Sequence, residues 1–348
     1  MRDWYLSSVW DEAFNNSVER PVIARDYLYA SQLGTSFIDC YHALKGVKPT
    51  NLPTLNANRK MESGKVWESV LYMTLKRAGI LKSSQEKIDF STDGMIEVHG
   101  KCDFIAGGKV DIQQALEFAE QTDFFFTELQ MPDIYKEIAT RMVDFIKSLE
   151  SESGIVELAE YVIECKSVSA FVFDLVEAKR EPSPYHKFQI FHYLKGLNLA
   201  KGKIIYINRD DARMLELTVY NDEKTYSEYK TWLKCFDYCW QNNEEPPKEP
   251  TITFNAETQK FYKNTVGVEW SRYLTMLYGY ESPTQYRDAI TPMVTKINYA
   301  FTRAIQGQKI TESNKEGLEL AKDFFKDLDE LIDRGKLWYV LKTENEQK

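Results

Sequence analysis

The chain has 348 residues, which is enough for one large domain or two ordinary ones. Hydrophobic residues make up 43% and charged residues 28%, and no apolar run is long enough to span a membrane, so a disordered chain and a membrane-spanning chain are both excluded. The formal net charge of −9 argues against a protein that coats nucleic acid nonspecifically, because such proteins are usually basic.

Helices and strands alternate in the first third of the chain. Apolar residues at helical spacing predict helices at 37–44 and 64–78. Between them, the polar segment 48–60 contains two prolines and is typical of a loop. Short apolar runs that flank a turn predict strands at 88–90 and 95–105.

The alternation continues through the middle of the chain and then stops. We predict helices at 112–149 (broken near Pro132), 183–199 and 225–240, and strands at 160–165, 170–176, 203–207 and 214–219. The run NNEEPPKEP at 242–250 has the composition of a linker. Beyond it we predict helices at 257–278, 282–306 and 312–339.

This order of elements predicts an α/β fold that is followed by a helical part. We therefore expect an α/β core at 1–241, a linker at 242–254 and a helical C-terminal region at 255–348. The sequence shows no internal repeat.

Two side chains in the run YVIECKS have the chemistry of a hydrolytic metal site. Because side chains alternate along a strand, Glu164 and Lys166 point to one face and Cys165 to the other. The carboxylate can bind a divalent cation, and the lysine can position or deprotonate the attacking water. The alternative is an ion pair at a solvent-exposed strand edge, and the same spacing recurs at Glu177-Ala-Lys179.

A second carboxylate stands in the strand HGKCDFIAGG. Asp103 is followed by Phe104 and Ile105, and an acidic side chain in such surroundings must be paired, solvated or metal-bound. Mg²⁺ is commonly held by one or two carboxylates together with waters and substrate phosphates, and Asp103 and Glu164 would supply these carboxylates. The alternative is an aspartate that ends a strand at a turn.

Two predicted helices carry further polar side chains. Gln189 and Tyr193 lie four residues apart and share a helix face with His186, while Phe188 and its apolar neighbours form another stripe. This pattern predicts a polar face outside the core that contacts a DNA backbone or stacks on a base, with an ordinary amphipathic surface helix as the alternative. Glu68, in the helix at 64–78, is either a further metal carboxylate or a solvated side chain.

The order of these residues resembles the RecB-type branch of the PD-(D/E)XK nuclease superfamily. That branch has a helix glutamate, a G-x-x-D strand, an E-x-K strand and a helix with Q-x-x-x-Y. The chain has, in the same order, Glu68, Gly100 to Asp103, Glu164 to Lys166, and Gln189 to Tyr193. The likeness covers residues 30–240 and includes the strand KGKIIYINRDD.

The resemblance implies a restriction-endonuclease-like core, with a mixed central sheet flanked by helices, and an exonuclease that cuts DNA with Mg²⁺ or Mn²⁺. The implied metal ligands are Asp103, Glu164, the Cys165 carbonyl and Glu68. Lys166 would serve the attacking water, and Gln189 and Tyr193 would support the site or hold single- or double-stranded DNA.

Two features depart from the pattern of that branch. The segment 109–158 is much longer than the usual hairpin and is interpreted as a helical insertion, which either docks a protein partner or forms a satellite core. Many relatives bind an iron–sulfur cluster through one early and three late cysteines, whereas the last cysteine here is Cys239, so we predict no cluster. The odd number of cysteines predicts reduced thiols. The first residues include acidic side chains where a signal peptide would be apolar, so we expect a cytoplasmic protein.

The C-terminal helices combine aromatic residues such as Trp270 with basic residues such as Arg272. Such a mixture either binds single strands or a protein partner, or forms a core with a solvated rim. The alternative to an enzyme is a non-catalytic nucleic-acid-binding or assembly protein of a phage or repair complex that retains the fold. The complete set of catalytic residue types favours the enzyme, and the acidic net charge favours the alternative.

Overall fold

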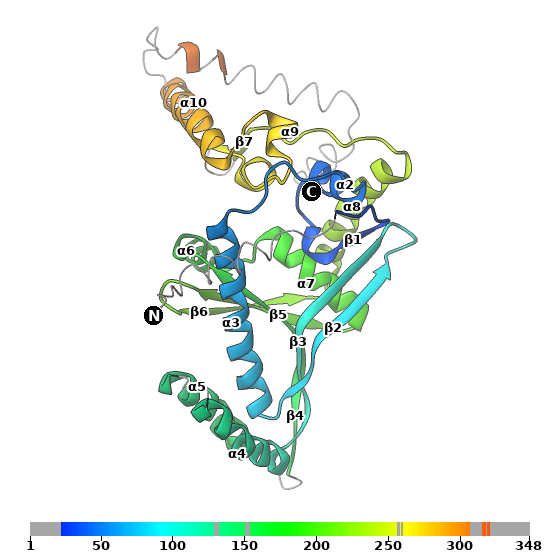
Figure 1. Cartoon of the computed structure of the whole chain (residues 1–348), viewed down its shortest axis with the longest axis vertical. Coiled ribbons are helices and arrows are strands. Elements are labelled where there is room, and N and C mark those ends of the chain that lie inside the picture. The colour runs from blue at the N-terminus through cyan, green and yellow to red at the C-terminus, as the bar shows by residue number, and fades with distance from the viewer. Residues whose placement is uncertain are drawn as a thin grey trace, which may run out of the picture. The chain divides into compact units, whose positions relative to one another are not determined.

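A mixed β-sheet organises the larger part of the computed structural model (Figure 1). The structure describes residues 22–128, 132–149, 154–255, 258, 260–306, 315–317 and 319–320. These residues divide into two units. Unit 1 contains Leu28–Gly34 and Pro53–Tyr229, and unit 2 contains 22–27, Thr35–Leu52 and the described residues from Lys230 onward.

The sheet has the strand order β1-β3-β4-β5-β6, with β2 paired to β3 on a side branch. Its strands are β1 (Tyr27–Tyr29), β2 (Leu81–Ser91), β3 (Glu97–Asp111), β4 (Ile155–Val168), β5 (Lys201–Asn208) and β6 (Met214–Tyr220). The pairs β2–β3, β3–β4 and β5–β6 are antiparallel, whereas β4 and β5 are parallel. The predicted α/β class with a mixed central sheet is thus confirmed.

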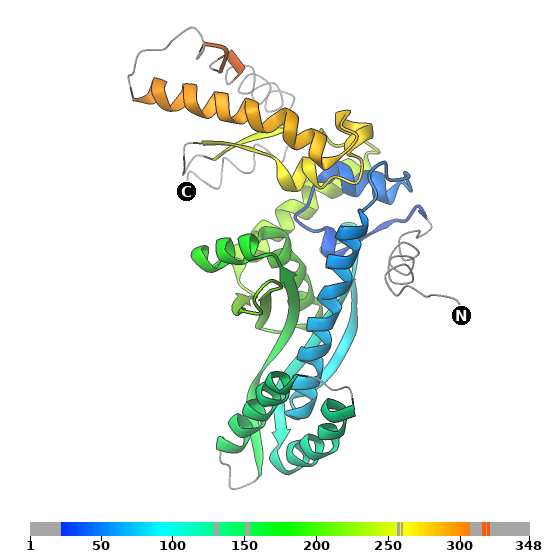
Figure 2. The same ribbon diagram turned by 60° about the vertical axis from the view of Figure 1, so that its left-hand side comes forward.

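Helices flank this sheet in unit 1. They are η1 (Ala30–Gln32), α3 (Leu55–Arg77), α4 (Ile112–Glu128), α5 (Asp133–Ser148), α6 (Ala170–Lys179) and α7 (Pro184–Leu197), with α8 (Glu223–Gln241) continuing into unit 2. Figure 2 shows α3 running along the sheet. Helices α4 and α5 lie beside the end of the sheet where β3 ends and β4 begins. No helix in the described ranges is long and apolar enough to cross a membrane.

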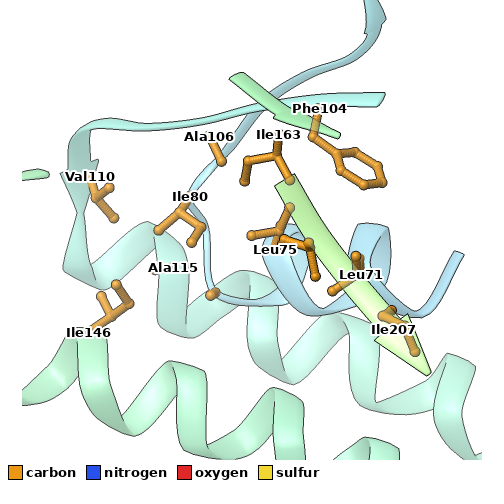
Figure 3. Close-up of a cluster of buried hydrophobic side chains, with 12 residues drawn as sticks. Leu71, Leu75, Ile80, Phe104, Ala106, Val110, Ala115, Ile146, Ile163 and Ile207 are labelled. Atoms are coloured by element: carbon orange, nitrogen blue, oxygen red, sulfur yellow. The ribbon is translucent and has the colours of Figure 1, made fainter. Parts of the chain in front are cut away.

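One face of the sheet packs against α3 through aliphatic side chains (Figure 3). Leu71 and Leu75 lie one helical turn apart and face Phe104 of β3 and Ile163 of β4. The helix begins at Leu55 because the Thr54 side chain accepts a hydrogen bond from the Ala57 backbone N–H at 3.2 Å. This contact face fixes the position of α3 relative to the centre of β4.

The opposite face of the sheet is covered by α7. A Cβ atom added at Gly202 of β5 would lie 2.7 Å from Val162 Cγ1 and 2.9 Å from Ile190 Cδ1. Gly202 therefore allows α7 to approach the sheet closely. Because Val162 and Ile163 are neighbours on β4, α7 and α3 lie on opposite faces of that strand.

Unit 2 has a small core of its own. Its elements are α2 (Phe37–Leu44), β7 (Ile252–Asn255), β8 (Lys260–Lys263), the π-helical turn η2 (Thr265–Glu269), α9 (Leu274–Tyr278) and α10 (Pro283–Ile305). Phe261, Val268 and Tyr286 are fully buried in this core. Antiparallel pairing joins β7 to β8.

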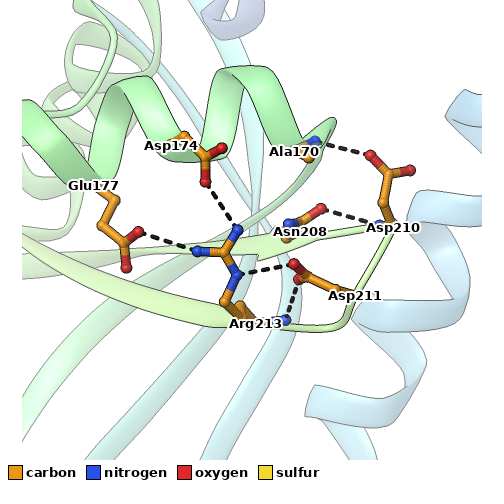
Figure 4. Close-up of polar contacts among 7 residues, drawn as sticks. All are labelled: Ala170, Asp174, Glu177, Asn208, Asp210, Asp211 and Arg213. Carbon is orange, nitrogen blue, oxygen red and sulfur yellow. Dashed lines mark hydrogen bonds and ion pairs between the residues drawn. The ribbon is translucent and has the colours of Figure 1, made fainter.

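Three predicted elements differ from the structure. The predicted strand at 170–176 is wrong because these residues form α6, with Phe173 and Val176 buried one turn apart. The Ala170 backbone N–H at the start of this helix donates to Asp210 Oδ2 at 2.9 Å (Figure 4), and Arg180 ends the helix with a φ of 52°. A short apolar run is compatible with a buried strand or a helix, which explains the error.

The predicted helix at 257–278 is also wrong. The β7–β8 hairpin occupies its first part, and η2 and α9 occupy the rest. Part of the loop predicted at 48–60 is helical, because α3 begins at Leu55. Of the helix predicted at 312–339, only 315–317 and 319–320 belong to the described residues, and the remainder lies outside them.

The helices between β3 and β4 and the extent of unit 2 bear on the predicted domain boundaries. Helices α4 and α5 connect β3 to β4 along the chain, within the segment 109–158 that is interpreted from the sequence as an insertion. Unit 2 includes 22–27 and Thr35–Leu52 in addition to the C-terminal part, although the sequence predicts those segments within the core at 1–241. The division into a core, a linker at 242–254 and a C-terminal region stays a prediction.

Candidate active site

The candidate site lies where the backbone pairing of β3 with β4 stops. The last pair of that ladder is Phe104 with Ile163. Just beyond it, the Cys165 backbone N–H donates a hydrogen bond to Asp103 Oδ2 at 2.7 Å. The Asp103 side chain therefore links the two strands at the point where their main chains no longer pair.

Glu164 is the centre of a buried polar network. Its Oε1 accepts hydrogen bonds from Lys166 Nζ at 2.7 Å and from Gln189 Nε2 at 2.8 Å. Lys166 Nζ also donates to Gln189 Oε1 at 2.9 Å, which closes a triangle of contacts. The Glu164 and Lys166 side chains are only 6% and 19% exposed. An ion pair this far from water needs such additional hydrogen bonds to offset its desolvation.

Tyr193 supports this network from the next turn of α7. Its hydroxyl accepts a hydrogen bond from Gln189 Nε2 at 3.0 Å. The tyrosine ring lies against Gly100 of β3, where an added Cβ atom would be only 2.6 Å from ring carbon Cε1. Gly100 is therefore required by the close approach of α7, and Tyr193 is packed too tightly to move away from Gln189.

Glu68 reaches the site from α3. Its Oε1 accepts a hydrogen bond from Gln85 Nε2 of β2 at 2.7 Å. One turn earlier, a Cβ atom at Gly64 would lie 3.7 Å from Ser167 Cβ, so α3 passes close to the end of β4. The sequence at 64–68 thus places a third carboxylate near Asp103 and Glu164.

The site holds more negative than positive charge. Burial, together with the charges of Glu164 and Glu68, raises the pKa of Asp103 to about 8 against the lowering effect of the Cys165 N–H. Burial and Glu164 likewise raise the pKa of Glu68. Burial alone would lower the pKa of Lys166, but its attraction to Glu164 outweighs burial and the pKa is raised. Lys166 is therefore a cation rather than a free base.

A divalent cation fits this arrangement. Glu164 Oε2 is buried and has no hydrogen-bond partner among the described residues, which is unusual for a carboxylate oxygen. Asp103 and Glu164 are the kind of oxygen ligands that Mg²⁺ and Mn²⁺ prefer. Within the described ranges, no three His, Cys, Asp or Glu side chains form a group that could hold an ion by themselves. An ion held by Asp103 and Glu164 would take its remaining ligands from water or phosphate.

The predicted exposed polar face of α7 is wrong. Gln189 is 7% exposed and Tyr193 is 1% exposed, so both side chains point into the protein and not toward a ligand in solvent. His186 Nδ1 lies 2.8 Å from the Tyr206 hydroxyl, and burial followed by the charge of Lys166 lowers its pKa to about 2. All three polar side chains are satisfied inside the fold, which the four-residue spacing did not indicate.

The rival pair Glu177 and Lys179 does not resemble the pair on β4. Both residues lie on α6, and Glu177 Oε2 is 3.2 Å from Arg213 Nη1. The chain's five cysteines all belong to the described residues and are free thiols. The role of the Cys165 carbonyl as a metal ligand stays a prediction.

Sequence reasoning missed Gln85 and did not show why Gly100 is a glycine. Gln85 holds Glu68, but it lies on the part of β2 that precedes the predicted strand at 88–90. Gly100 belongs to the G-x-x-D pattern, yet its close contact with Tyr193 depends on the packing of α7. The only related signal in the sequence was the spacing of four residues between Gln189 and Tyr193, which places both side chains on one helix face.

Fold and site together define an α/β protein with a buried carboxylate–lysine centre. No family model and no curated protein sequence matches the chain. The chain is similar to the crystal structure of SSO0001, with a TM-score of 0.37 and 13% identity over 69% of this chain and 89% of that one. It is also similar to an alkaline exonuclease (LHK-Exo) from Laribacter hongkongensis, with a TM-score of 0.35 and 10% identity over 67% and 93% of the two chains. Because both TM-scores lie below 0.5, we infer function from the site alone.

Proposed function

We propose that the chain is a Mg²⁺- or Mn²⁺-dependent DNA nuclease that hydrolyses phosphodiester bonds, and that it acts as an exonuclease. The observation that supports this most directly is the contact set at the end of the β3–β4 ladder. There Asp103, Glu164 and Lys166 come together, and one buried oxygen of Glu164 has no partner among the described residues. Two carboxylates beside one held ammonium group are suited to metal-assisted attack on a phosphate.

In this proposal Asp103 and Glu164 hold the metal ion, and Glu68 and the Cys165 carbonyl complete its surroundings. The bound ion would supply positive charge that acidifies a water molecule and stabilises the phosphate. Lys166 is a cation, so its ammonium group donates a hydrogen bond to the attacking water or to a phosphate oxygen and does not remove a proton. Gln189 and Tyr193 are positioning residues that fix Glu164 and Lys166.

The nearby side chains favour direct attack by water over a covalent intermediate. Burial raises the pKa of Tyr193 far above its usual range, and its hydroxyl is occupied by Gln189. Burial also raises the pKa of the Cys165 thiol, so this sulfur stays protonated and is a weak nucleophile. The water oxygen would therefore form the new bond to phosphorus as the ester P–O bond breaks. The proton that the water loses would pass to solvent, and the leaving oxygen would take a proton from solvent.

The test is cleavage of end-labelled DNA, linear and circular, single- and double-stranded, with Mg²⁺ or Mn²⁺. The variant Lys166→Ala is expected to cut about 10²- to 10⁴-fold more slowly than wild type. Lys203→Ala is the matched control, because Lys203 also lies on a strand of the sheet and forms an ion pair, 2.6 Å from Glu216. It is expected to cut at the wild-type rate. An exonuclease would degrade linear DNA and spare circular DNA.

Two outcomes would contradict this proposal. If wild type cuts no DNA with either metal, the non-catalytic nucleic-acid-binding or assembly role is the better interpretation. If wild type cuts and Lys166→Ala cuts equally fast, the reaction takes place elsewhere on the chain. Cleavage of circular DNA would leave the metal-dependent nuclease intact and replace the exonuclease by an endonuclease.

A further inference from the structure

A polar pocket of about 360 Å³ lies beside α3, between the start of β2 and the first turns of α4. Lys76, Lys82 and Ser83 are among its polar lining residues, and Tyr72 and Phe118 contribute aromatic rings. All of its walls belong to unit 1. The pocket therefore combines ammonium and hydroxyl donors with two ring faces.

This pocket adjoins the candidate active site along two elements. On α3, Tyr72 and Lys76 follow Glu68 at steps of four residues, so the three side chains share one helix face. On β2, the pocket residues Ser83 and Ser84 immediately precede Gln85, whose side chain holds Glu68. Two helical turns separate Glu68 from Lys76, a distance of about 12 Å.

The floor of the pocket is closed by direct packing of the α3 C-terminus on α4. A Cβ atom added at Gly79, whose φ is +68°, would lie 2.6 Å from Ala115 Cβ. Only glycine permits this approach, and it brings Phe118 of α4 over Lys76 of α3, with Nζ 5.9 Å from the ring centre. One wall of the pocket thus comes from the helices inserted between β3 and β4.

The contacts of the two lysines leave them suited to bind an anion. Lys76 Nζ lies 5.4 Å from the centre of the Tyr72 ring and donates to its hydroxyl at 3.3 Å. Lys82 pairs with Glu160, and its side chain is 45% exposed. An exposed ion pair contributes little stability, so Lys82 can turn from Glu160 toward a phosphate without a large loss of stability. The rings of Tyr72 and Phe118 offer faces on which a base can stack.

We propose that this pocket binds one nucleotide of the DNA strand that flanks the bond being cut, with its phosphate on Lys76 and Lys82 and its base against Phe118. The inference rests on the proposed nuclease function. The distance of two helical turns from Glu68 means that this phosphate is not the one attacked but one farther along the strand. The pocket would hold the strand in register while the carboxylate–lysine centre acts.

The test compares Lys76→Gln/Lys82→Gln with the control Lys201→Gln/Lys203→Gln. The control removes two lysines that also lie over a tyrosine, at 4.8 and 4.7 Å from the Tyr161 ring centre, and that do not line the pocket. Binding of a fluorescent oligothymidylate is measured in EDTA, which prevents cleavage, over a range of salt concentrations. The pocket variant should bind more weakly, with a slope of log affinity against log salt smaller by about 0.7 for each phosphate that it no longer neutralises.

A single-residue variant separates stacking from charge. Phe118→Ala should lower the affinity roughly fivefold or more without changing the salt slope, because it removes a stacking face and no charge. For the unmodified chain, bound oligothymidylate should protect Lys76 and Lys82 from acetylation while Lys201 and Lys203 react as before. This measurement needs no variant, so it still tests the proposal if the pocket variants fail to fold.

The outcomes distinguish the pocket from the catalytic centre. If wild type cuts DNA and the pocket variant binds and cuts like its control, the pocket proposal is overturned and the nuclease stands. Protection of the two lysines by thymidine monophosphate but not by the oligonucleotide would also overturn it. If the strand binds in the pocket and no cleavage occurs with either metal, the pocket proposal is supported and the nuclease is not.

Discussion

Unit 1 has two places where three carboxylates and one cation influence one another: at one place all three carboxylates pair with the cation, and at the other only one does. At the candidate site the cation is Lys166. At the turn between β5 and β6 it is Arg213 (Figure 4), which lies 2.8 Å from Asp174, 3.2 Å from Glu177 and 2.9 Å from Asp211. Arg213 and these partners are 44–60% exposed, whereas Glu164 and Lys166 are almost withdrawn from water.

The comparison shows that burial, not composition, decides what a cluster of charges does. Hydrogen bonds from Arg213 lower the pKa of Asp211, so that carboxylate is ionised and satisfied. Burial raises the pKa of Asp103 to about 8, so that carboxylate is ionised only at a cost in free energy. The cluster around Arg213 is a solvated surface feature. The cluster around Lys166 would be stabilised by additional positive charge.

Removing one charge from each cluster should give the largest difference between the two. Glu164→Gln is expected to slow DNA cleavage by about 10³-fold, because it removes a charge that would hold the metal ion. Glu177→Gln removes a carboxylate from the exposed cluster and should leave the initial rate unchanged. Equal rates for the two variants would mean that the buried cluster is not the active centre.

Packing around the buried cluster offers the next largest effect. Gly100→Ala is expected to lower the free energy of unfolding by about 1–3 kcal/mol, because the new Cβ would overlap the Tyr193 ring. Gly64→Ala is the control, since its Cβ would meet only Ser167 at 3.7 Å within a helix. That variant should be more stable by about 0.5–1 kcal/mol. Urea unfolding of both variants measures these values, and a neutral Gly100→Ala would contradict the tight contact.

The pH dependence of stability should distinguish Asp103 from Asp211. The raised pKa of Asp103 means that the folded chain binds more protons than the unfolded chain between pH 4 and 8, so its contribution to stability falls as the pH rises through that window without metal. Asp103→Asn should flatten this dependence and stabilise the metal-free protein at pH 8 by about 1 kcal/mol or more.

The same variant gives a readout for the metal. Mg²⁺ or Mn²⁺ should raise the melting temperature of wild type at pH 8, because an ion that binds only the folded state stabilises it. Asp103→Asn should show little of this increase. An equal increase in both proteins would place the ion elsewhere.

The smallest effect is expected at the exposed cluster. Arg213→Ala should leave cleavage and the melting temperature at pH 7 close to those of wild type, because ion pairs in water contribute little. The lowered pKa of Asp211 means that any contribution of this cluster is lost only in acid, as the pH falls below the usual carboxyl range. A marked loss of cleavage in this variant would remove the contrast between the two clusters.

Much of the candidate site followed from spacing alone. The E-x-K pattern places Glu164 and Lys166 on one face of a strand, and their contact at 2.7 Å agrees with that expectation. Asp103 and Glu68 were recognised by their order along the chain, and the structure places Glu68 of α3 near enough for its charge to raise the pKa of Asp103. The roles of these residues in catalysis and metal binding stay predictions.

The remainder depended on packing between distant segments. Helical spacing grouped Gln189 with Tyr193, but it did not show that both side chains are buried. The run at 170–176 forms a helix because Phe173 and Val176 meet the core one turn apart, and its β-branched and aromatic residues had favoured a strand. The pocket beside α3 combines residues from three elements, so no single stretch of sequence indicates it.

The two inserted helices begin and end at a paired position of the sheet. Asp111, the last residue of β3, is the register partner of Ile155, the first residue of β4. The chain that leaves the sheet therefore returns to it at the same rung, so the length and sequence of the excursion do not alter the register of Phe104 with Ile163. Natural variation can lengthen, shorten or replace α4 and α5 while Asp103 and Glu164 keep their spacing. In evolutionary terms, the two helices could diverge without moving the candidate site.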